Sequence, residues 1–268
     1  MRRSRPVGSR NERPMLTEQE SRRYSRQVAL PEIGVEGQLR LAAGRVMVVG
    51  LGGLGSIAAY YLAAAGVGYL KLIDRDRVDL ENLNRQILHS TADLDRPKTE
   101  SAAEKLSRLN PHCRIEAVQT TIEDDNAAAL LADCALIFDA TDNRKTREVL
   151  NRLSLRRRVP FVYGGISGWD GMASTFIPGR GACFSCLFPP QPEATESPPS
   201  PALGPTAGLV ASIQCMETLR LLIGALPQLA GRLLRFSGLT MEFRTLQIDR
   251  NPLCPVCGSS QPQHHSTP

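Results

Sequence analysis

Long hydrophobic runs are missing from this sequence of 268 residues, although 42% of its residues are hydrophobic. No apolar stretch approaches the roughly 20 residues that cross a bilayer, and the first residues lack the apolar core of a secretory signal peptide. We therefore expect a soluble, cytoplasmic protein with no membrane partner. The hydrophobic content is enough for one substantial core, which favours a single large domain, residues 16–258, with short appendages.

Aromatic residues and helical periodicity are both absent from the arginine-rich start of the chain. Its cations stand among Ser, Pro, Gly and Asn, and they are Arg2, Arg3, Arg5, Arg10 and Arg13. Nucleic-acid-binding segments combine such charge with aromatic residues, and targeting segments combine it with an amphipathic period. We therefore predict a disordered basic tail over residues 1–15, no nucleic-acid partner, and a second flexible tail over residues 259–268.

Histidine is scarce and is not clustered with other reactive groups. The chain has four histidines, of which His89 and His112 are isolated and His264 and His265 fall in the polar tail. None of them stands in a recognisable base or metal-ligand pattern, so none is assigned a role.

A glycine-rich stretch follows directly on a short apolar run. Residues 46–49 (Val-Met-Val-Val) predict a strand, and residues 50–55 (Gly-Leu-Gly-Gly-Leu-Gly) precede an alanine-rich helical pattern over residues 56–65. Such glycines let the backbone approach a phosphate, and the helix start offers free N–H groups. The glycines assigned to the nucleotide are Gly50, Gly52, Gly53 and Gly55. The alternative is a purely structural turn.

The polar residues after this turn favour ATP over NAD. A second predicted strand, residues 70–73, ends at Asp74, where a carboxylate holds a ribose hydroxyl. The next polar side chains are Asp76, Asn82, Arg85 and Lys98. NAD needs no such set of cations and metal-type oxygen ligands. ATP does, because Arg and Lys neutralise the charge that builds up when its α-phosphate is attacked.

Helices and strands alternate through the first 160 residues. A capping-box pattern, Thr17 to Glu20, predicts a helix that continues through Gln27, and a second helix is expected over residues 36–43. Further helices are expected over residues 98–109, 123–132 and 143–158, and strands over residues 114–118 and 135–138. The alternation predicts a doubly wound, mostly parallel, Rossmann-like α/β sheet.

Two aspartates follow the last of these strands. Ligands bind at the carboxyl ends of parallel strands, so Asp139 and Asp142, with Asn143 beside them, should share an edge with the glycine turn. A carboxylate in that place can hold Mg²⁺ against phosphates, and we assign this role to Asp142. The alternative is that one aspartate only caps the following helix.

The predicted pattern of secondary structure changes after Pro160. Residues 161–163, 171–177, 233–237 and 241–248 predict strands of a more antiparallel portion. Residues 187–205 are crowded with Pro, Ser and Glu, which is typical of an extended crossing loop, and a helix is expected over residues 206–223.

Two C-x-x-C pairs stand far apart in this second half. They supply four soft ligands for a tetrahedral Zn²⁺, namely Cys183, Cys186, Cys254 and Cys257. Disulfides are the alternative, but no secretory signal supports them. A shell of four thiolates is closed, so we expect a structural zinc with no part in the chemistry. Cys113, Cys134 and Cys215 lie in apolar stretches and are expected to be buried.

These motifs together resemble the ThiF/MoeB/HesA family. The resemblance runs from about residue 17 to residue 258 and rests on spaced segments: residues 22–27 (Arg-Arg-Tyr-Ser-Arg-Gln), 50–55, 81–86 (Glu-Asn-Leu-Asn-Arg-Gln), 141–143 (Thr-Asp-Asn), 183–188, 203–205 (Leu-Gly-Pro) and 254–258. The family adenylates the C-terminal glycine of a ubiquitin-like sulfur carrier of the ThiS/MoaD type. The joint occurrence of these spaced motifs in one chain is highly specific for the family.

The resemblance implies partners and residue roles. It implies a homodimer that binds ATP and Mg²⁺ on each subunit, with residues 16–160 as the nucleotide-binding half and residues 161–258 as the carrier-binding half. The carrier's Gly-Gly tail is implied to pass under the crossing loop. By matching motifs, Gly53 and Asp74 bind the nucleotide, Asn82, Arg85 and Lys98 contact the phosphates, Asp142 holds Mg²⁺, and Arg26 reaches the ATP of the neighbouring subunit.

The chain departs from the family in its crossing loop, which contains no cysteine. Ser197 stands where some members have one, and Glu81 stands where a small polar residue is common. The chain ends 11 residues after Cys257, from which we expect no appended rhodanese domain. We therefore expect an adenylyltransferase that stops at the acyl-adenylate and depends on a separate sulfurtransferase or cysteine desulfurase. An NAD-dependent oxidoreductase and a non-catalytic carrier-binding relative are the alternatives.

Overall fold

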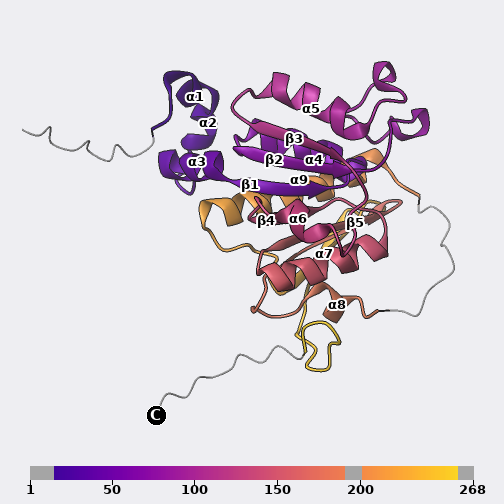
Figure 1. Ribbon diagram of the computed structural model, residues 1–268. Coiled ribbons are helices and arrows are strands. Elements are labelled where there is room, and N and C mark those ends of the chain that lie inside the picture. Colours follow the sequence, from indigo (N-terminus) through magenta and orange to yellow (C-terminus); the bar gives the residue numbers. More distant parts are fainter. Residues whose placement is uncertain (1–14, 191–200, 259–268) are drawn as a thin grey trace, which may run out of the picture.

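A computed structural model describes residues 15–190 and 201–258. The predicted terminal tails, apart from Met15, and the centre of the predicted crossing loop, including Ser197, lie outside these ranges. The described strands form a single sheet in the order β3-β2-β1-β4-β5-β6-β7-β8. Helices cover both faces of this sheet (Figure 1).

The first five strands are parallel. They are β1 (Arg45–Val49), β2 (Tyr69–Asp74), β3 (Arg114–Gln119), β4 (Leu136–Asp139) and β5 (Phe161–Ser167). β1 lies centrally and pairs with β2 on one side and β4 on the other. After β1, the chain adds β2 and β3 on one side of β1 and then crosses to add β4 and β5 on the other side. The carboxyl ends of β1 and β4 therefore flank the crevice where doubly wound folds bind ligands.

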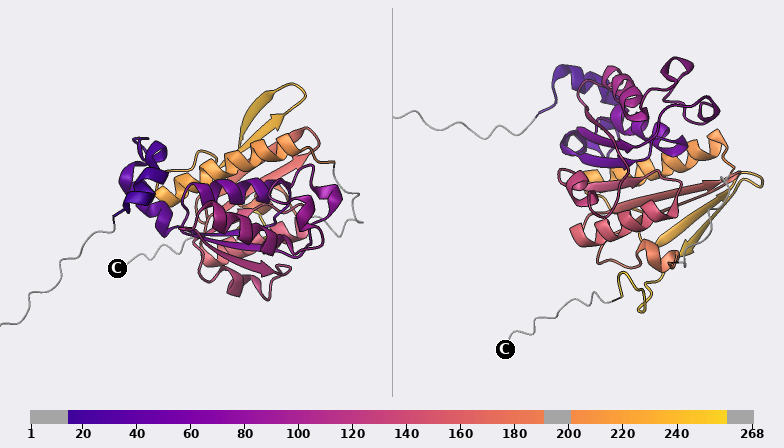
Figure 2. Two further views of the ribbon diagram at one scale, coloured as in Figure 1. Left: turned by 90° about the horizontal axis from the view of Figure 1, so that it is seen from above. Right: turned by 45° about the vertical axis from the view of Figure 1, so that its right-hand side comes forward.

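The remaining strands are antiparallel, which confirms the predicted change of character after Pro160. They are β6 (Asp170–Phe176), β7 (Arg232–Ser237) and β8 (Glu242–Gln247), and each pairs with the strand before it. All six residues of β8 are exposed. The β7–β8 hairpin projects from the body of the protein (Figure 2).

Two hydrophobic clusters fill the space between the sheet and its helices. On one face, α4 (Gly53–Ala64), α5 (Lys98–Leu109) and α9 (Gly204–Ile223) pack over the even-numbered side chains of β1 and β2. On the other face, α6 (Ala127–Leu131), α7 (Arg144–Arg157) and α8 (Phe184–Leu187) cover Met47, Val49 and Ile73. A sheet buried on both faces accounts for the continuous apolar character of these strands.

Two helices differ from the sequence-based expectation. Thr17 and Glu20 form the predicted capping box, but α1 (Glu18–Arg23) stops at Tyr24, and α2 (Ser25–Val28) begins after it. Tyr24 is buried, and its hydroxyl accepts a hydrogen bond of 2.8 Å from Nδ2 of Asn110. α6 begins only at Ala127, because the Asn126 side chain bonds Glu123 N and Thr121 O in a local turn.

The longest described helix corrects the expectation that no apolar stretch could cross a bilayer. α9 has 20 residues and a mean hydropathy of 1.2, and among the described helices it alone meets the length and composition for a membrane span. Half of that stretch is nevertheless buried inside the protein, where α9 packs on α4 and on β5 and β6. A core helix of a globular protein meets the same criteria, so the packing of α9 is enough to explain its apolar composition.

Candidate active site

The glycine turn after β1 is in backbone contact with the loop after β4. Gly50 has a φ of +92°, and a Cβ atom there would lie 2.6 Å from the carbonyl oxygen of Ala140. A Cβ on Gly55 would lie 1.9 Å from the carbonyl oxygen of Gly50. Both positions therefore require glycine. Gly52 and Gly53 are half-buried at the start of α4, where its first N–H groups can meet an anion.

Asp74 lies at the end of β2 and holds this turn. Its carboxylate accepts 2.7 Å and 2.8 Å hydrogen bonds from the backbone N–H groups of Leu51 and Asp76. Burial raises the pKa of Asp74, while the nearby Lys98 ammonium and these two N–H groups act in the opposite direction. Each carboxylate oxygen retains a lone pair, so Asp74 can still accept from a ribose hydroxyl.

The two predicted phosphate-binding cations are held by the predicted oxygen ligands. Lys98 is only 4% exposed, and its Nζ lies 3.2 Å from Oδ2 of Asp76. Arg85 donates from Nη2 to Oδ1 of Asn82 at 2.8 Å and from Nη1 to the carbonyl of Glu81 at 3.0 Å. Asn82 ends a short 3₁₀ helix, η1 (Leu80–Asn82). All four predicted side chains thus lie on the carboxyl side of β2.

Asp139 and Asp142 have different environments. Asp139 is fully buried, accepts from the N–H and hydroxyl of Thr141 at 2.9 Å and 2.6 Å, and lies 3.2 Å from Nε of Arg147. Burial raises the pKa of Asp139, and the Arg147 guanidinium opposes that rise. Asp142 is exposed at the rim. The helix cap comes from neither aspartate, because Oδ1 of Asn143 accepts from the N–H of Thr146.

Arg147 was not identified from the sequence, although it fixes the loop that carries Asp142. Its guanidinium donates to the carbonyl of Thr141 and, at 3.2 Å, to that of Gly164 in β5. It also lies over the ring of Tyr163, 5.1 Å from the centroid. Arg147 comes one helical turn after Asn143, on the helix face that continues to the buried Leu150. This spacing could have identified Arg147 as a residue that faces the site.

Arg26 is the predicted site residue that the structure does not bring to this rim. It lies on α2, whose Gln27 donates to the carbonyl of Ala65 at the far end of α4. The length of α4, about 18 Å, therefore separates α2 from the glycine turn. Arg26 is exposed at the amino ends of the strands.

The four paired cysteines meet in space. Their sulfur atoms all lie within 4.8 Å of one another, with 3.7 Å between Cys183 and Cys254 and 3.4 Å between Cys186 and Cys257. Four sulfurs in a tetrahedron with zinc bonds of about 2.3 Å would be about 3.8 Å apart. Although burial acts against it, N–H groups of Cys257 and Val256 help to lower the pKa of the Cys254 thiol to about 7. The cluster can therefore hold a tetrahedral metal ion.

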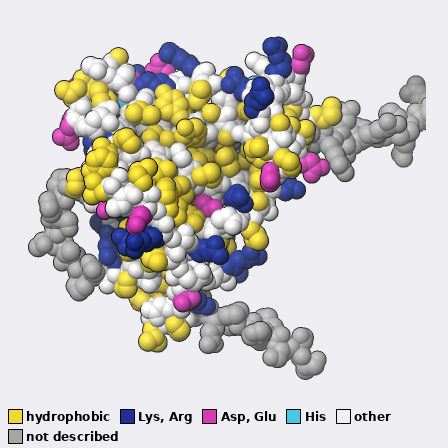
Figure 3. Space-filling model, turned by 180° about the vertical axis from the view of Figure 1, so that it is seen from behind, with side chains coloured by type: hydrophobic (Ala, Val, Ile, Leu, Met, Phe, Trp, Pro, Cys, Tyr) yellow, Lys and Arg dark blue, Asp and Glu magenta, His cyan; other side chains and the backbone are white. Residues whose placement is uncertain are grey.

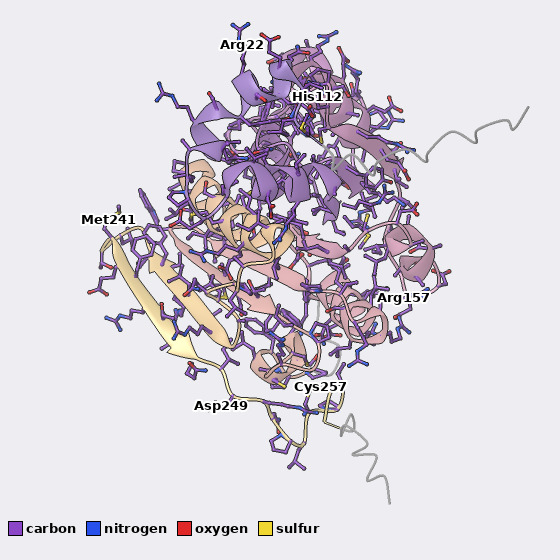
Figure 4. All side chains as sticks on the ribbon, turned by 90° about the vertical axis from the view of Figure 1, so that its left-hand side faces the viewer. Arg22, His112, Arg157, Met241, Asp249 and Cys257 are labelled. Atoms are coloured by element: carbon purple, nitrogen blue, oxygen red, sulfur yellow. The ribbon has the colours of Figure 1, made fainter. Side chains whose placement is uncertain are left out.

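The cysteine cluster is anchored against α7. Asn151, in the middle of α7, donates to Oγ of Ser185 at 3.0 Å and accepts from the N–H of Phe184, which fixes the first C-x-x-C pair against that helix. Figure 4 shows Cys257 at the opposite end of the protein from Arg22. The other cysteines, Cys113, Cys134 and Cys215, are buried as predicted.

Sequence comparison identifies the family. The sequence model of the ThiF family matches residues 24–256. The chain belongs to the ThiF family. This confirms the resemblance seen in the motifs and removes the grounds for an NAD-dependent oxidoreductase.

Three relatives match most of this ThiF-family chain. The adenylyltransferase and sulfurtransferase MOCS3 of Drosophila willistoni is 44% identical over 92% of this chain and 55% of its own length. The SAMP-activating enzyme E1 of Haloferax volcanii is 42% identical over 88% of both chains. The sulfur carrier protein adenylyltransferase of Thermus thermophilus is 40% identical over 92% of this chain and 94% of its own. The chain thus spans about half of the fly protein and most of the other two.

Solved structures share this ThiF-family fold. The crystal structure of E. coli MccB with ATP has a TM-score of 0.78 and 21% identity, covering 88% of this chain and 74% of that one. The crystal structure of PaaA has a TM-score of 0.77 and 23% identity, covering 91% and 78%. At such identities the comparison establishes the architecture alone.

The buried and exposed aspartates should respond differently to loss of charge. Asp139→Asn leaves the Arg147 guanidinium without its buried partner, so we expect the free energy of unfolding to fall by about 3 kcal/mol. Asp142→Asn, the matched variant at an exposed position, should change it by less than about 0.5 kcal/mol. Urea denaturation measures both. Equal losses would contradict the structural role given to Asp139.

Proposed function

We propose that this ThiF-family protein uses ATP to adenylate the C-terminal glycine of a small ubiquitin-like sulfur-carrier protein. The observation that carries the proposal is the convergence of the glycine turn, Asp74, Arg85, Lys98 and Asp142 at one rim, in a chain that matches a sulfur carrier protein adenylyltransferase over 92% of its length. A carrier carboxylate oxygen bonds to the α-phosphorus of ATP, the bond to the bridging oxygen breaks, and pyrophosphate leaves. The product is an acyl-adenylate.

The residues at the rim position the reactants and stabilise charge. The carrier's carboxylate is already a nucleophile at neutral pH, so the reaction needs no general base. Gly52, Gly53 and the start of α4 receive the phosphates, Asp74 orients the ribose, and Arg85 and Lys98 face the charge that develops on the departing pyrophosphate. Lys98 is desolvated before ATP arrives, which strengthens its electrostatic effect.

Asp142 is the group that fits Mg²⁺. It is an exposed carboxylate in the loop whose Ala140 carbonyl faces the glycine turn. Mg²⁺ in nucleotide sites is held by one or two carboxylates together with substrate phosphates and waters, and Asp142 supplies one such accessible carboxylate. When bound, the ion would neutralise phosphate charge and orient the α-phosphate.

The position of Arg26 leads us to propose a homodimer with shared sites. Within one chain α4 separates Arg26 from the glycine turn, so Arg26 can act only on the ATP of a neighbouring subunit. Apolar side chains gather on the side where α9 lies (Figure 3). Tyr61, Ile87 and Met216 are each more than half exposed and lie on α4, on the loop after η1 and on α9. An apolar surface of this kind is typical of a subunit contact.

The cysteine cluster is proposed to hold a structural Zn²⁺, and sulfur transfer is assigned to a separate protein. Four thiolates leave no open position on zinc, so the ion would tie the segment after β8 to α8 and α7. Cys215 is the first described thiol after the crossing loop that lies outside this cluster. It is buried, and burial raises the pKa of its thiol, which makes it a poor nucleophile for a covalent intermediate. A separate sulfurtransferase or cysteine desulfurase is therefore the proposed consumer of the adenylate.

Carrier-dependent exchange of pyrophosphate into ATP tests the proposed reaction. The wild-type protein should catalyse exchange only with a carrier that ends in Gly-Gly, and Asp142→Ala should lower the rate about a hundredfold. Asp133→Ala, which removes another exposed carboxylate, is the control and should leave the rate unchanged. Exchange by Asp142→Ala at the wild-type rate would refute the role of Asp142, and no exchange with any such carrier would refute the proposed function.

Mixing two inactive variants tests the shared site. Arg26→Ala and Asp142→Ala should each be inactive as homodimers, but a hybrid dimer contains one site with Asp142 from one chain and Arg26 from the other. After unfolding and joint refolding in equal amounts, about a quarter of the wild-type exchange activity should return. No recovery, with hybrids confirmed by mass spectrometry, would show that Arg26 does not act across subunits.

Metal analysis tests the zinc site. One Zn²⁺ per chain should copurify, and Cys254→Ser should lose it and unfold at a clearly lower temperature, because metal binding and folding are coupled. Its ATP affinity should change little. Cys134→Ser is the control, since Cys134 lies in the core beneath α6 and should leave the zinc content at one. Purified protein without zinc and with these thiols as disulfides would contradict the proposal.

A further inference from the structure

Gln214, in the middle of α9, is a fully buried polar side chain to which the sequence assigned no role. Its Nε2 donates to the carbonyl of Asp139 at 2.7 Å and to the carbonyl of Val162 at 3.3 Å. Asp139 is the last residue of β4, and Val162 lies in β5. The amide of Gln214 therefore connects α9 to both strands.

This connection lies where the pairing of β4 with β5 ends. The described sheet pairs these strands at two positions, Ile137 with Phe161 and Phe138 with Val162. Beyond these positions the strand ladder no longer holds β4 and β5 together. The Gln214 amide takes over that task at the carboxyl end of β4, from which the loop that carries Asp142 begins.

The orientation of the amide is set by its neighbours. Both partners are carbonyl oxygens, so the NH₂ end of Gln214 faces them and Oε1 points away. Oε1 is buried and has no hydrogen-bond partner among the described residues, and a Cβ on Gly164 would lie 2.3 Å from it. An apolar side chain would avoid burying this unsatisfied oxygen. The two donated hydrogen bonds, rather than core packing, therefore account for a glutamine here.

The bond to Asp139 acts on the peptide that leads into the Asp142 loop. The N–H of that peptide, which belongs to Ala140, donates to the carbonyl of Val49 in β1 at 2.8 Å. Its C=O accepts from Gln214. The peptide is thus held by the central strand through one group and by α9 through the other. The next carbonyl along the chain is the one that lies against the glycine turn.

The same helix contacts two other parts of the rim. A Cβ on Gly204, the first residue of α9, would lie 2.9 Å from the carbonyl oxygen of Asn84, and a Cβ on Gly53 would lie 3.1 Å from Cβ of Ala207. α9 therefore packs closely on the segment that ends in Arg85 and on the glycine turn. Through Gln214 it also holds the start of the Asp142 loop.

α9 is itself fixed on the antiparallel part of the sheet. Glu217, less than one turn after Gln214, accepts 2.8 Å hydrogen bonds from the hydroxyl of Thr175 in β6 and from the N–H groups of Gln228 and Leu229. These three bonds restrain the helix beside the Gln214 amide. A helix held in this way can keep the segments that it contacts in a constant relation.

We infer that Gln214 is a positioning residue for Asp142, the proposed Mg²⁺ ligand, because its amide ties the start of the Asp142 loop to the helix that also packs on the glycine turn. The inference rests on the proposed function. It predicts that loss of the Nε2 donor lets this loop move relative to the phosphate-binding groups, although Gln214 itself touches neither ATP nor metal.

Gln214→Met tests this role, because it keeps the length of the side chain and removes both donated bonds. We expect carrier-dependent pyrophosphate exchange to slow about tenfold, and the Mg²⁺ concentration that gives half-maximal activity to rise. Thr218→Val is the matched control. Thr218 is buried one turn further along α9 and its hydroxyl has no hydrogen-bond partner among the described residues, so this variant should change neither quantity.

A double substitution separates positioning from a general loss of packing. If Gln214 acts through Asp142, Gln214→Met should slow pyrophosphate exchange by less than about twofold in a protein that already carries Asp142→Ala. A further tenfold loss in that protein would overturn the inference. So would wild-type activity and Mg²⁺ dependence in the single variant Gln214→Met.

Amide hydrogen exchange measured by NMR gives a test that needs neither ATP nor carrier. In the wild type the N–H of Ala140 should exchange only through global unfolding, whereas in Gln214→Met it should exchange at least tenfold faster than the N–H groups of β1. Local opening at Ala140 in the wild type would overturn the inference, even if Gln214→Met does not fold, and so would equal protection in the folded variant. If the wild type catalyses no pyrophosphate exchange with any carrier, the proposed function fails, while amide exchange still tests Gln214.

Discussion

The site depends on one backbone contact, in which the turn after β1 lies directly against the loop after β4. The missing side chains of Gly50 and Gly55 allow it, since a Cβ on either would enter the space of a carbonyl oxygen. The contact brings the start of α4 and the Asp142 loop to the same place, although nearly ninety positions separate them in the chain. Asp74 and Arg147 then hold these two segments through their backbone groups.

Charge at the rim is already organised. Lys98 is paired with Asp76, and Arg85 is held by Asn82 and the carbonyl of Glu81. Each cation is therefore restrained by a neighbour, and little side-chain entropy would remain to be lost on binding the phosphates of the proposed ATP. Asp76 and Asn82, which the sequence predicted as nucleotide-binding residues, are thus also the residues that hold the two cations in place.

Local patterns predicted much of this structure. The capping box at Thr17, the strand, glycine turn and helix of residues 46–65, and the paired C-x-x-C motifs each depend on neighbours in sequence or on a fixed ligand geometry. The break at Tyr24 could not be predicted, because it follows from a hydrogen bond to Asn110, 86 positions away. The sequence assigned the metal to Asp142 rather than Asp139, but it could not predict the buried ion pair of Asp139, since Arg147 becomes the partner of Asp139 only after α7 packs.

The position of α9 has a consequence for how the chain folds during synthesis. The core beneath α4 is closed by α9, where Ala207 meets Gly53 and the thiol of Cys215 lies 3.8 Å from the carbonyl of Ala58. Until Ile223 has left the ribosome, the apolar faces of α4 and of β4 and β5 have no cover. The apolar core beneath α4 thus depends on α9 for its cover, and chains shortened before α9 would expose the surface that chaperones recognise.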